Sequence, residues 1–179
     1  MIHVSEPFEN KPLVMKTELQ KAVYDTLEYL EIPFIRVDND EAITMQDCTE
    51  ISKKLNVRIV KTLFLCNRQK TMFYLFVTTE EKSFVTKDFS KALGISRVSF
   101  ASSDMLLEML GTKSGAATVL SSVADTEQNV NIIFDSNALN EEWYGCTDGT
   151  TTGYMKIRTE DLINKYLPFT NHRPIVIKV

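Results

Sequence analysis

Cysteine, histidine, glycine and proline are all scarce in this chain. Its 179 residues include three cysteines, two histidines, six glycines and five prolines. The three cysteines are far apart in sequence, which excludes the disulfide framework of a small secreted domain. The two histidines lie near opposite ends and no CxxC or HxxxH pair occurs, so nothing marks a zinc site. With 44% hydrophobic residues, the chain is also not a disordered or fibrous protein.

Long apolar runs are missing as well. No segment approaches the ~20 apolar residues that a membrane-spanning helix needs. The first residues, MIHVSEPFENKP, do not have the basic-then-apolar order of a secretion signal. We therefore expect a cytoplasmic protein without membrane contact. The length fits one domain, which we place at residues 17–179 behind an N-terminal arm at 1–16.

The charge is unevenly distributed along the chain. The net charge of −4 argues against a general nucleic-acid coat. Residues 53–97, however, carry ten basic side chains and three acidic ones. Such a local positive field could hold a short stretch of phosphate backbone. The alternative is that these charges are ordinary solvated faces of strands and helices.

Hydrophobic periodicity and turn residues predict an α+β domain around one mixed, mostly antiparallel sheet surrounded by helices. Helices are expected from Thr17 and from Thr44, where Asp47 completes a capping pattern. Thr159 is the expected cap of a late helix, and Gly94 and Gly111 are expected to end two others. The segments that read as strands are 34–38, 57–67, 71–79, 118–122, 129–135, 155–158 and 174–179. The hydroxyl-rich segment 143–154 reads as a surface loop.

Lys61 is the most informative single residue. Alternation along the strand at 57–67 gives Lys61 the same face as Ile59 and Leu63, so an ammonium group stands among apolar neighbours. A cation fixed at the floor of a pocket could bind a phosphate or a polarised carbonyl. The alternative is a snorkelling lysine, whose stem packs while its ammonium reaches water.

Two loops could contribute to a site. Around Gly115 the small residues Ser114 and Ala116 would let a ligand approach the backbone, although a helix end followed by a turn explains them equally well. In the second loop Cys146 could be a reactive thiol, with His172 as a distant partner. No GxSxG elbow is present, and both Cys-His and Ser-His-Asp catalysis are disfavoured.

The ordered segments IPFIRVDNDEAITMQDC, VRIVKTLFLCNRQK, KDFSKALG, SRVSFAS, LGTKSGAATVL, TEDLINKYL and NHRP resemble the prolyl-tRNA editing family, also called YbaK or prolyl-tRNA-synthetase-associated domains. The likeness covers about Val23 to Val176 and is strongest to the stand-alone prolyl-tRNA deacylase branch. It implies that the ester of mischarged tRNA, typically alanyl-tRNA(Pro), is hydrolysed in trans, without a cofactor or metal. The implied partner is the aminoacylated 3′ end of tRNA.

The resemblance also implies site residues. Lys61 matches the family's central lysine, and Gly115 matches the glycine of its Gly-x-x-x-Pro loop, with Val119 at the proline position. Thr62 stands where many members have asparagine. Lys61 and Gly115 are thus the expected catalytic residues. The expected substrate-binding residues are Thr44, Thr62, Ala116, Thr118, Gly145 and Thr147.

One departure from the family bears on activity. Many members carry a His-Pro pair after a glycine, and here Thr147 and Asp148 replace it. Threonine only donates or accepts a hydrogen bond, and Asp148 is expected to add negative charge near the RNA end. Two hypotheses follow besides thiol chemistry at Cys146. The first is an active deacylase in which backbone N–H groups near Gly115 stabilise the oxyanion. The second is a catalytically weakened relative that binds tRNA ends or a small amino acid as a sensor.

Overall fold

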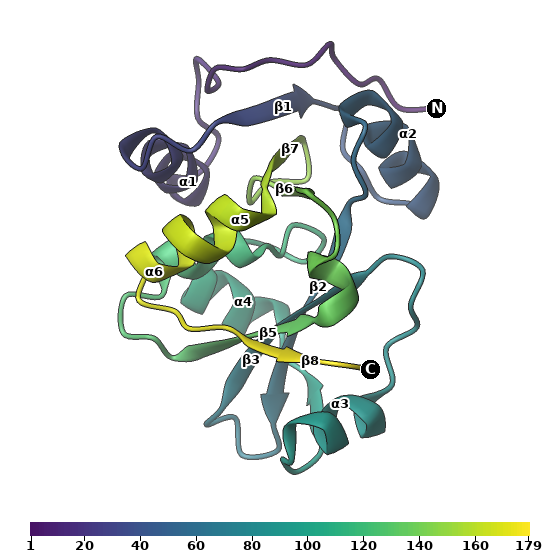
Figure 1. Cartoon of the computed structure of the whole chain (residues 1–179), viewed down its shortest axis with the longest axis vertical. Coiled ribbons are helices and arrows are strands. Elements are labelled where there is room, and N and C mark those ends of the chain that lie inside the picture. The colour runs from purple at the N-terminus through teal and green to yellow at the C-terminus, as the bar shows by residue number, and fades with distance from the viewer.

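A computed structural model describes all 179 residues as two β-sheets with helices around them (Figure 1). The smaller sheet has the antiparallel order β1-β7-β6. The larger is mixed and has the order β4-β2-β3-β5-β8. The sheets meet where Ile59 forms an isolated parallel bridge to Gly145. The α+β class is confirmed, but the single mixed sheet that we expected is wrong, because the strands divide between two sheets joined only by this bridge.

The strands are short and paired mostly antiparallel. In the small sheet, β1 (Phe34–Asp38) and β6 (Trp143–Thr147) flank β7 (Gly153–Arg158). In the large sheet, the hairpin of β2 (Val60–Asn67) and β3 (Phe73–Thr79) is flanked by β4 (Val98–Phe100) and β5 (Val130–Asp135). The strand β8 (Ile175–Ile177) runs parallel to β5 at the edge. The predicted hairpin and final strand are therefore confirmed.

Side-chain caps start the first helices as the sequence predicts. The helix α1 (Glu18–Tyr29) begins where Thr17 Oγ1 accepts from the backbone N–H of Gln20. The helix α2 (Met45–Leu55) has a complete capping box, because Asp47 also accepts from the backbone of Thr44. The helices α3 (Thr86–Leu93) and α4 (Ser103–Leu110) both end at glycines in the left-handed conformation. These two glycines are Gly94 and Gly111, as expected.

Three predictions about secondary structure are wrong. Residues 118–122 are not a strand, because Val119–Ala124 form a 3₁₀ helix, η1, in which Ser121 Oγ donates to the carbonyl of Thr118. Such local hydrogen bonds between a hydroxyl side chain and the backbone compete with the hydrogen bonds that would pair this segment in a sheet. Residues 143–154 are not a simple loop, since they contain β6 and the start of β7. Thr159 is the first helical residue rather than the cap of the late helix.

That late helix is continuous from residue 159 to 169, with a π-helical middle. It comprises α5 (Thr159–Asp161), η3 (Leu162–Tyr166) and α6 (Leu167–Phe169). The hydroxyl of Thr159 donates to the carbonyl of Glu141, which ties the start of the helix to the connection before β6. A second 3₁₀ turn, η2 (Ser136–Leu139), follows β5.

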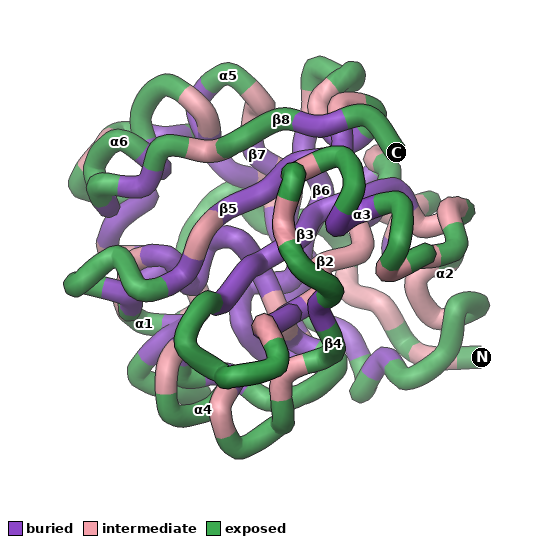
Figure 2. The backbone as a smooth tube through the Cα atoms, turned by 90° about the horizontal axis from the view of Figure 1, so that it is seen from below, coloured by how far each residue is buried: buried purple, intermediate pink, exposed green.

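The main core lies between the two sheets and α1, α4 and the late helix. It contains 26 buried residues, with Tyr24, Phe134, Tyr144 and Tyr166 among the largest. β3 and β5 run through the middle as buried segments (Figure 2). A smaller cluster lies on the other face of the large sheet and includes Phe89 of α3. No helix is long and apolar enough to cross a membrane.

Residues 5–10 of the N-terminal arm pack along β1. Main-chain hydrogen bonds join Phe8 to Arg36 in both directions, and Ser5 donates to Asp38. The guanidinium of Arg36 lies 4.8 Å from the centre of the Phe8 ring and donates to the carbonyl of Asn10. This arm therefore covers the outer edge of the small sheet.

Candidate functional site

Lys61 lies in the first half of β2, opposite Thr78 of β3. Its side chain is half-buried, and its ammonium donates to the main-chain carbonyl of Lys82 in the loop after β3. An ammonium group has three N–H donors, so two remain for other acceptors. Nearby, burial and Glu81 raise the pKa of the Glu80 carboxyl, and Lys61 opposes that shift. The loop after β3 therefore partly covers Lys61.

Lys82, whose carbonyl accepts from Lys61, is itself anchored. Its ammonium is 2.8 Å from Oδ2 of Asp135, a carboxylate with no exposed surface. Thr78 donates to the same oxygen at 2.7 Å. Burial raises the pKa of Asp135, but the bonds from Lys82, Thr78 and the Asn137 backbone outweigh it and hold that pKa below its usual value.

Thr62 points to the opposite side of β2 from Lys61. It lies near the hydroxyl of Tyr144, a core residue that is only 1% exposed. Burial raises the pKa of the Tyr144 hydroxyl well above its ordinary value. Thr62 and Lys61 thus face two different environments, because adjacent side chains of a strand alternate.

The loop between α4 and η1 carries Gly115, at φ +89°, a value that glycine adopts without strain. The main-chain N–H groups of Ser114, Gly115 and Ala117 donate to no acceptor in the protein. Ala116 and Thr118, in contrast, are fully buried, and Thr118 Oγ1 caps η1 by accepting from the N–H of Leu120. The exposed part of this loop is therefore a set of free backbone donors around Gly115.

The connection between β6 and β7 is built around the carboxylate of Asp148. Oδ2 accepts from Gln20 Nε2 and Tyr24 OH, each at 2.9 Å. Oδ1 accepts from the backbone N–H and the hydroxyl of Thr150, at 3.1 and 2.7 Å. Burial raises the pKa of Asp148, and these bonds oppose the rise. The carboxylate is 1% exposed and faces α1, so its oxygens bond inside the protein, and that it adds charge near the RNA end stays a prediction.

Gly153 leaves the space that this carboxylate occupies. A Cβ atom on Gly153 would lie 2.2 Å from Oδ2 of Asp148. Thr147 is also part of the connection, since its hydroxyl donates to the carbonyl of Thr150 and accepts from the N–H of Gly149. Thr147 is 6% exposed, so its hydroxyl is used inside the turn.

A cavity of about 370 Å³ lies between the glycine loop and this turn. Thr112 connects its two sides, because its hydroxyl donates to the carbonyls of Ala116 and Gly149. Gly115 lies beside it, since a Cβ there would be 3.6 Å from Thr151 Cγ2. The lining residues are Lys16, Thr17, Glu41, Leu107, Gly111, Thr112, Lys113, Gly149, Thr150, Thr151 and Thr152. Lys61 does not line this cavity.

Polar groups around the cavity come from segments far apart in sequence. Glu41 Oε1 is 3.2 Å from the hydroxyl of Thr151 and 3.5 Å from the ammonium of Lys113. Lys16 donates to the hydroxyl of Thr152. The sequence patterns did not point to these residues. Glu41, Lys113 and Thr151 each lie within four residues of a predicted site residue, and that proximity was the one signal that could have found them.

Two other predicted residues have structural positions that explain their identity. Thr44 is the exposed N-cap of α2, three residues after Glu41. Gly145 lies where β6 crosses the start of β2, and a Cβ there would be 2.6 Å from the carbonyl oxygen of Arg58. The structure thus brings the Gly115 loop, the Thr147 turn and the segment before Thr44 together, with Lys61 on a neighbouring strand.

Thiol chemistry has no support in the site. Cys146 is buried, and burial raises the pKa of its thiol to about 12. His172 lies elsewhere and is paired with Asp125 at 2.9 Å and with Thr170 at 3.0 Å. A thiol with so high a pKa is a poor nucleophile at neutral pH. No group of three or more His, Cys, Asp or Glu side chains is arranged to hold a metal ion.

Comparison with known proteins defines the class of this protein. The family model of the aminoacyl-tRNA editing domain matches residues 40–165. The chain therefore belongs to the aminoacyl-tRNA editing domain family.

Individual relatives extend the likeness over most of the chain. The chain is 25% identical over 148 residues to the prolyl-tRNA editing protein ProX of Acetoanaerobium sticklandii, and the match covers 83% of this chain and 90% of that protein. The chain is also 25% identical over 166 residues to prolyl-tRNA synthetase associated domain-containing protein 1 of Danio rerio, and the match covers 92% of this chain and 89% of that protein. The fold matches the crystal structure of a candidate trans-editing enzyme for prolyl-tRNA synthetase, with a TM-score of 0.66 at 15% identity, over 92% of this chain and 99% of that one.

Proposed function

We propose that the protein is an aminoacyl-tRNA deacylase that acts in trans on mischarged tRNA in the cytoplasm, with alanyl-tRNA(Pro) as the substrate. The observation that carries this proposal is the family match over residues 40–165. That range contains all eight candidate residues, from Thr44 to Thr147. The relative in A. sticklandii is a prolyl-tRNA editing protein, which supports proline tRNA as the carrier.

In the proposed reaction, water attacks the carbonyl carbon of the aminoacyl ester. The bond between that carbon and the ribose oxygen breaks, the ribose oxygen takes up a proton, and free amino acid and tRNA leave. Developing charge on the carbonyl oxygen would be stabilised by the free N–H groups of Ser114, Gly115 and Ala117. No titratable side chain is required there, and the ribose hydroxyl of the substrate can assist.

Lys61 would bind the terminal phosphate or the ester end. Two of its N–H donors remain when the third is bonded to Lys82. Because the ammonium lies under the loop after β3, a substrate phosphate would enter between that loop and β2. Selection for a small amino acid needs only a small pocket, since a bulkier side chain is excluded sterically.

The test is release of [¹⁴C]alanine from alanyl-tRNA(Pro), measured with wild type, Lys61→Ala and the matched control Lys165→Ala. Lys165 is an exposed lysine of the late helix, outside the residues assigned to the site. We expect wild type and Lys165→Ala to hydrolyse the ester at equal rates, with Lys61→Ala slower by about 10² or more. Equal ester loss in buffer and in all three proteins would refute the proposal.

A second candidate function is a catalytically weakened relative that binds tRNA ends or a small amino acid. The observation in its favour is that the hydroxyl of Thr147, at the family's histidine position, is used within the turn. This candidate predicts that wild type binds alanyl-tRNA(Pro) without hydrolysing it, and that Thr147→His gains hydrolysis. Hydrolysis by wild type at rates well above buffer would exclude it.

A further inference from the structure

Five basic side chains at one end of the molecule have no acidic partner. They are Arg68, Lys70, Lys87, Lys91 and Arg97, and none of them takes part in an ion pair or a side-chain hydrogen bond. All five are exposed. Asp88 is the one acidic residue within 67–72 and 86–100. This end is therefore strongly positive on a protein whose net charge is −4.

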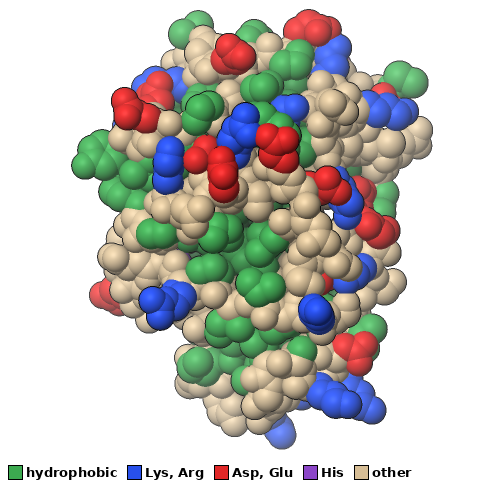
Figure 3. Space-filling view, viewed as in Figure 1, with side chains coloured by type: hydrophobic (Ala, Val, Ile, Leu, Met, Phe, Trp, Pro, Cys, Tyr) green, Lys and Arg blue, Asp and Glu red, His purple; other side chains and the backbone are tan.

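The fold brings these cations together from three segments. Asn67 pairs with Val98 in the antiparallel β2–β4 ladder, so Arg68 and Arg97, the next residues outward, are neighbours. Lys87 and Lys91 are four residues apart on α3, which places them on one face of that helix. The β2–β3 turn and α3 lie together at the lower end in Figure 1, and blue side chains predominate at that end in Figure 3.

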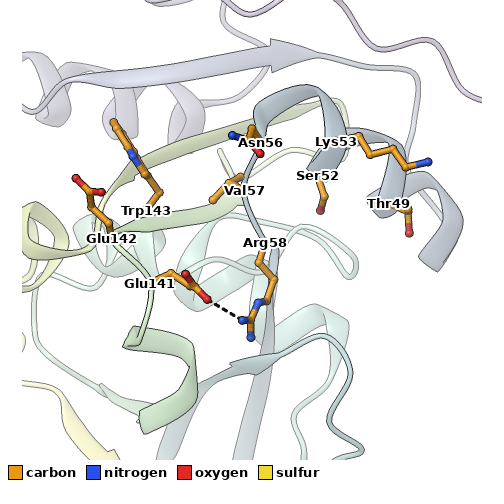
Figure 4. A pocket seen from close by; sticks show the side chains of 9 residues that line it. All are labelled: Thr49, Ser52, Lys53, Asn56, Val57, Arg58, Glu141, Glu142 and Trp143. Atoms are coloured by element: carbon orange, nitrogen blue, oxygen red, sulfur yellow. Dashed lines mark hydrogen bonds and ion pairs between the residues drawn. The ribbon is translucent and has the colours of Figure 1, made fainter.

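The basic residues around another cavity behave differently. This cavity, of about 540 Å³, lies between α2 and the start of β6 (Figure 4). There Arg58 is 2.9 Å from Glu141, and Arg158 pairs with Glu142. These charges are balanced by acids, so the cavity offers little net attraction to a polyanion.

An exposed aromatic ring lies on β4, three residues after Arg97. Phe100 of β4 is 63% exposed, and its ring is packed edge-on against Phe84 with centroids 5.7 Å apart. Three residues later, Ser103 begins α4, and its hydroxyl is 2.8 Å from that of Ser114. Ser114 is the neighbour of Gly115. The chain therefore leads directly from the basic end, past Phe100, to the glycine loop.

We propose that this surface, made of Arg68, Lys70, Lys87, Lys91, Arg97 and Phe100, binds the acceptor arm of an RNA. The cations contact its phosphates, and Phe100 stacks on a base or ribose near the 3′ end. Phosphates attract unpaired cations without sequence preference, and an exposed ring beside them is typical of single-stranded RNA contacts. That the 3′ end of the bound RNA points toward Gly115 rests on the proposed function, whereas the binding of RNA to this surface does not.

The test is binding of an uncharged acceptor-stem minihelix with a single-stranded 3′ end, followed by fluorescence anisotropy at several salt concentrations. The double variant Arg68→Gln/Arg97→Gln is compared with Lys21→Gln/Arg173→Gln, which removes the same charge from exposed positions elsewhere. We expect the first to weaken binding about tenfold and to lower the slope of log Kd against log salt by about two. The second should bind as wild type does.

Phe100 is tested separately. Phe100→Ala should weaken binding roughly fivefold or more, and Phe100→Tyr should retain it, because tyrosine keeps the ring face. Thermal unfolding of both variants shows whether they are folded. Equal RNA affinity of wild type, both double variants and Phe100→Ala would overturn the proposal. Loss of binding to polyglutamate, but not to RNA, in Arg68→Gln/Arg97→Gln would assign the surface to an acidic protein instead.

Failure of the proposed function is visible independently of this surface. Alanyl-adenosine contains the ester but no acceptor stem, so Arg68→Gln/Arg97→Gln should hydrolyse it at the wild-type rate while losing activity on alanyl-tRNA. If wild type hydrolyses neither substrate, the deacylase proposal fails. The comparison of RNA affinities still decides whether the surface binds RNA.

Discussion

Replacing Asp148 by alanine should lower the free energy of unfolding by about 3 kcal/mol. The carboxylate accepts from Gln20 Nε2, Tyr24 OH and both the N–H and the hydroxyl of Thr150. Alanine leaves three of these buried donors without a partner, since the Thr150 hydroxyl is free to rotate. Each orphaned donor costs roughly 1–3 kcal/mol. The alanine variant no longer has to bury a carboxylate, and the absence of that desolvation cost offsets part of the loss.

A double-mutant cycle with Gly153 makes this prediction specific. A Cβ on Gly153 would meet Oδ2 of Asp148 at 2.2 Å, so Gly153→Ala in the wild-type protein should cost about 3 kcal/mol through overpacking. In the Asp148→Ala background the obstructing oxygen is absent. The second alanine should then cost under about 1 kcal/mol, giving a coupling energy of about 2 kcal/mol.

Urea unfolding monitored by far-ultraviolet circular dichroism measures all four proteins of the cycle. The matched control is Gly94→Ala, a glycine at φ +67° with nothing within 4 Å of its would-be Cβ. That substitution should cost about 1 kcal/mol from backbone strain and should be additive with Asp148→Ala. An additive cycle at residues 148 and 153 would refute the assignment of Asp148 as the centre of the turn.

Three further predictions concern the supports of the site. Lys82→Ala should destabilise the fold by about 2 kcal/mol in urea unfolding, because it leaves the buried carboxylate of Asp135 without its cation. The expected loss is smaller than for a fully buried pair, since the Lys82 side chain is 29% exposed. Unchanged stability would show that the pair is not coupled. The pKa of Asp135 in the folded protein lies below its usual value. The contribution of its ionised carboxylate to the free energy of unfolding is therefore complete above pH ~4 and is lost as the pH falls through the folded pKa. Asp135→Asn should flatten the acid side of a plot of stability against pH. An unchanged acid side would contradict this. Gly145→Ala should lower the free energy of unfolding by at least about 2 kcal/mol, because its Cβ would meet the Arg58 carbonyl oxygen at 2.6 Å. A thermal unfolding curve equal to that of wild type would show that β6 does not cross β2 as described.

Much of the fold follows from local sequence signals. The capping residues Thr17 and Thr44 and the terminal glycines Gly94 and Gly111 mark real helix ends. Each of these signals acts within one turn of helix, so it needs no knowledge of the tertiary structure. The β2–β3 hairpin is equally local, because both strands consist of long runs of strand-forming residues.

The missed strand β6 shows where local reading fails. Tyr144 and Cys146 alternate inward and are both buried, which is a strand pattern. Gly145 between them suggested a loop, yet it is required there because β6 passes the backbone of Arg58 closely. Such a requirement depends on a strand more than eighty residues away, so it is not visible from neighbouring residues.

The site shows the same limit. Alternation along the strand predicted that Lys61 and Thr62 have different surroundings, and they do. The burial of Asp148 against Gln20 and Tyr24 could not be predicted, since α1 and the turn are more than a hundred residues apart. The grouping of Glu41 with Thr151 around the cavity is likewise a product of tertiary packing.

The most direct test of the central claim is the single-turnover rate of alanine release from alanyl-tRNA(Pro) at equal concentrations of wild type and Lys61→Ala. We expect clear hydrolysis by wild type and a rate for Lys61→Ala that is lower by about two orders of magnitude. Wild-type hydrolysis that persists unchanged in Lys61→Ala would contradict the role assigned to that ammonium. Absence of hydrolysis in wild type would contradict the deacylase itself.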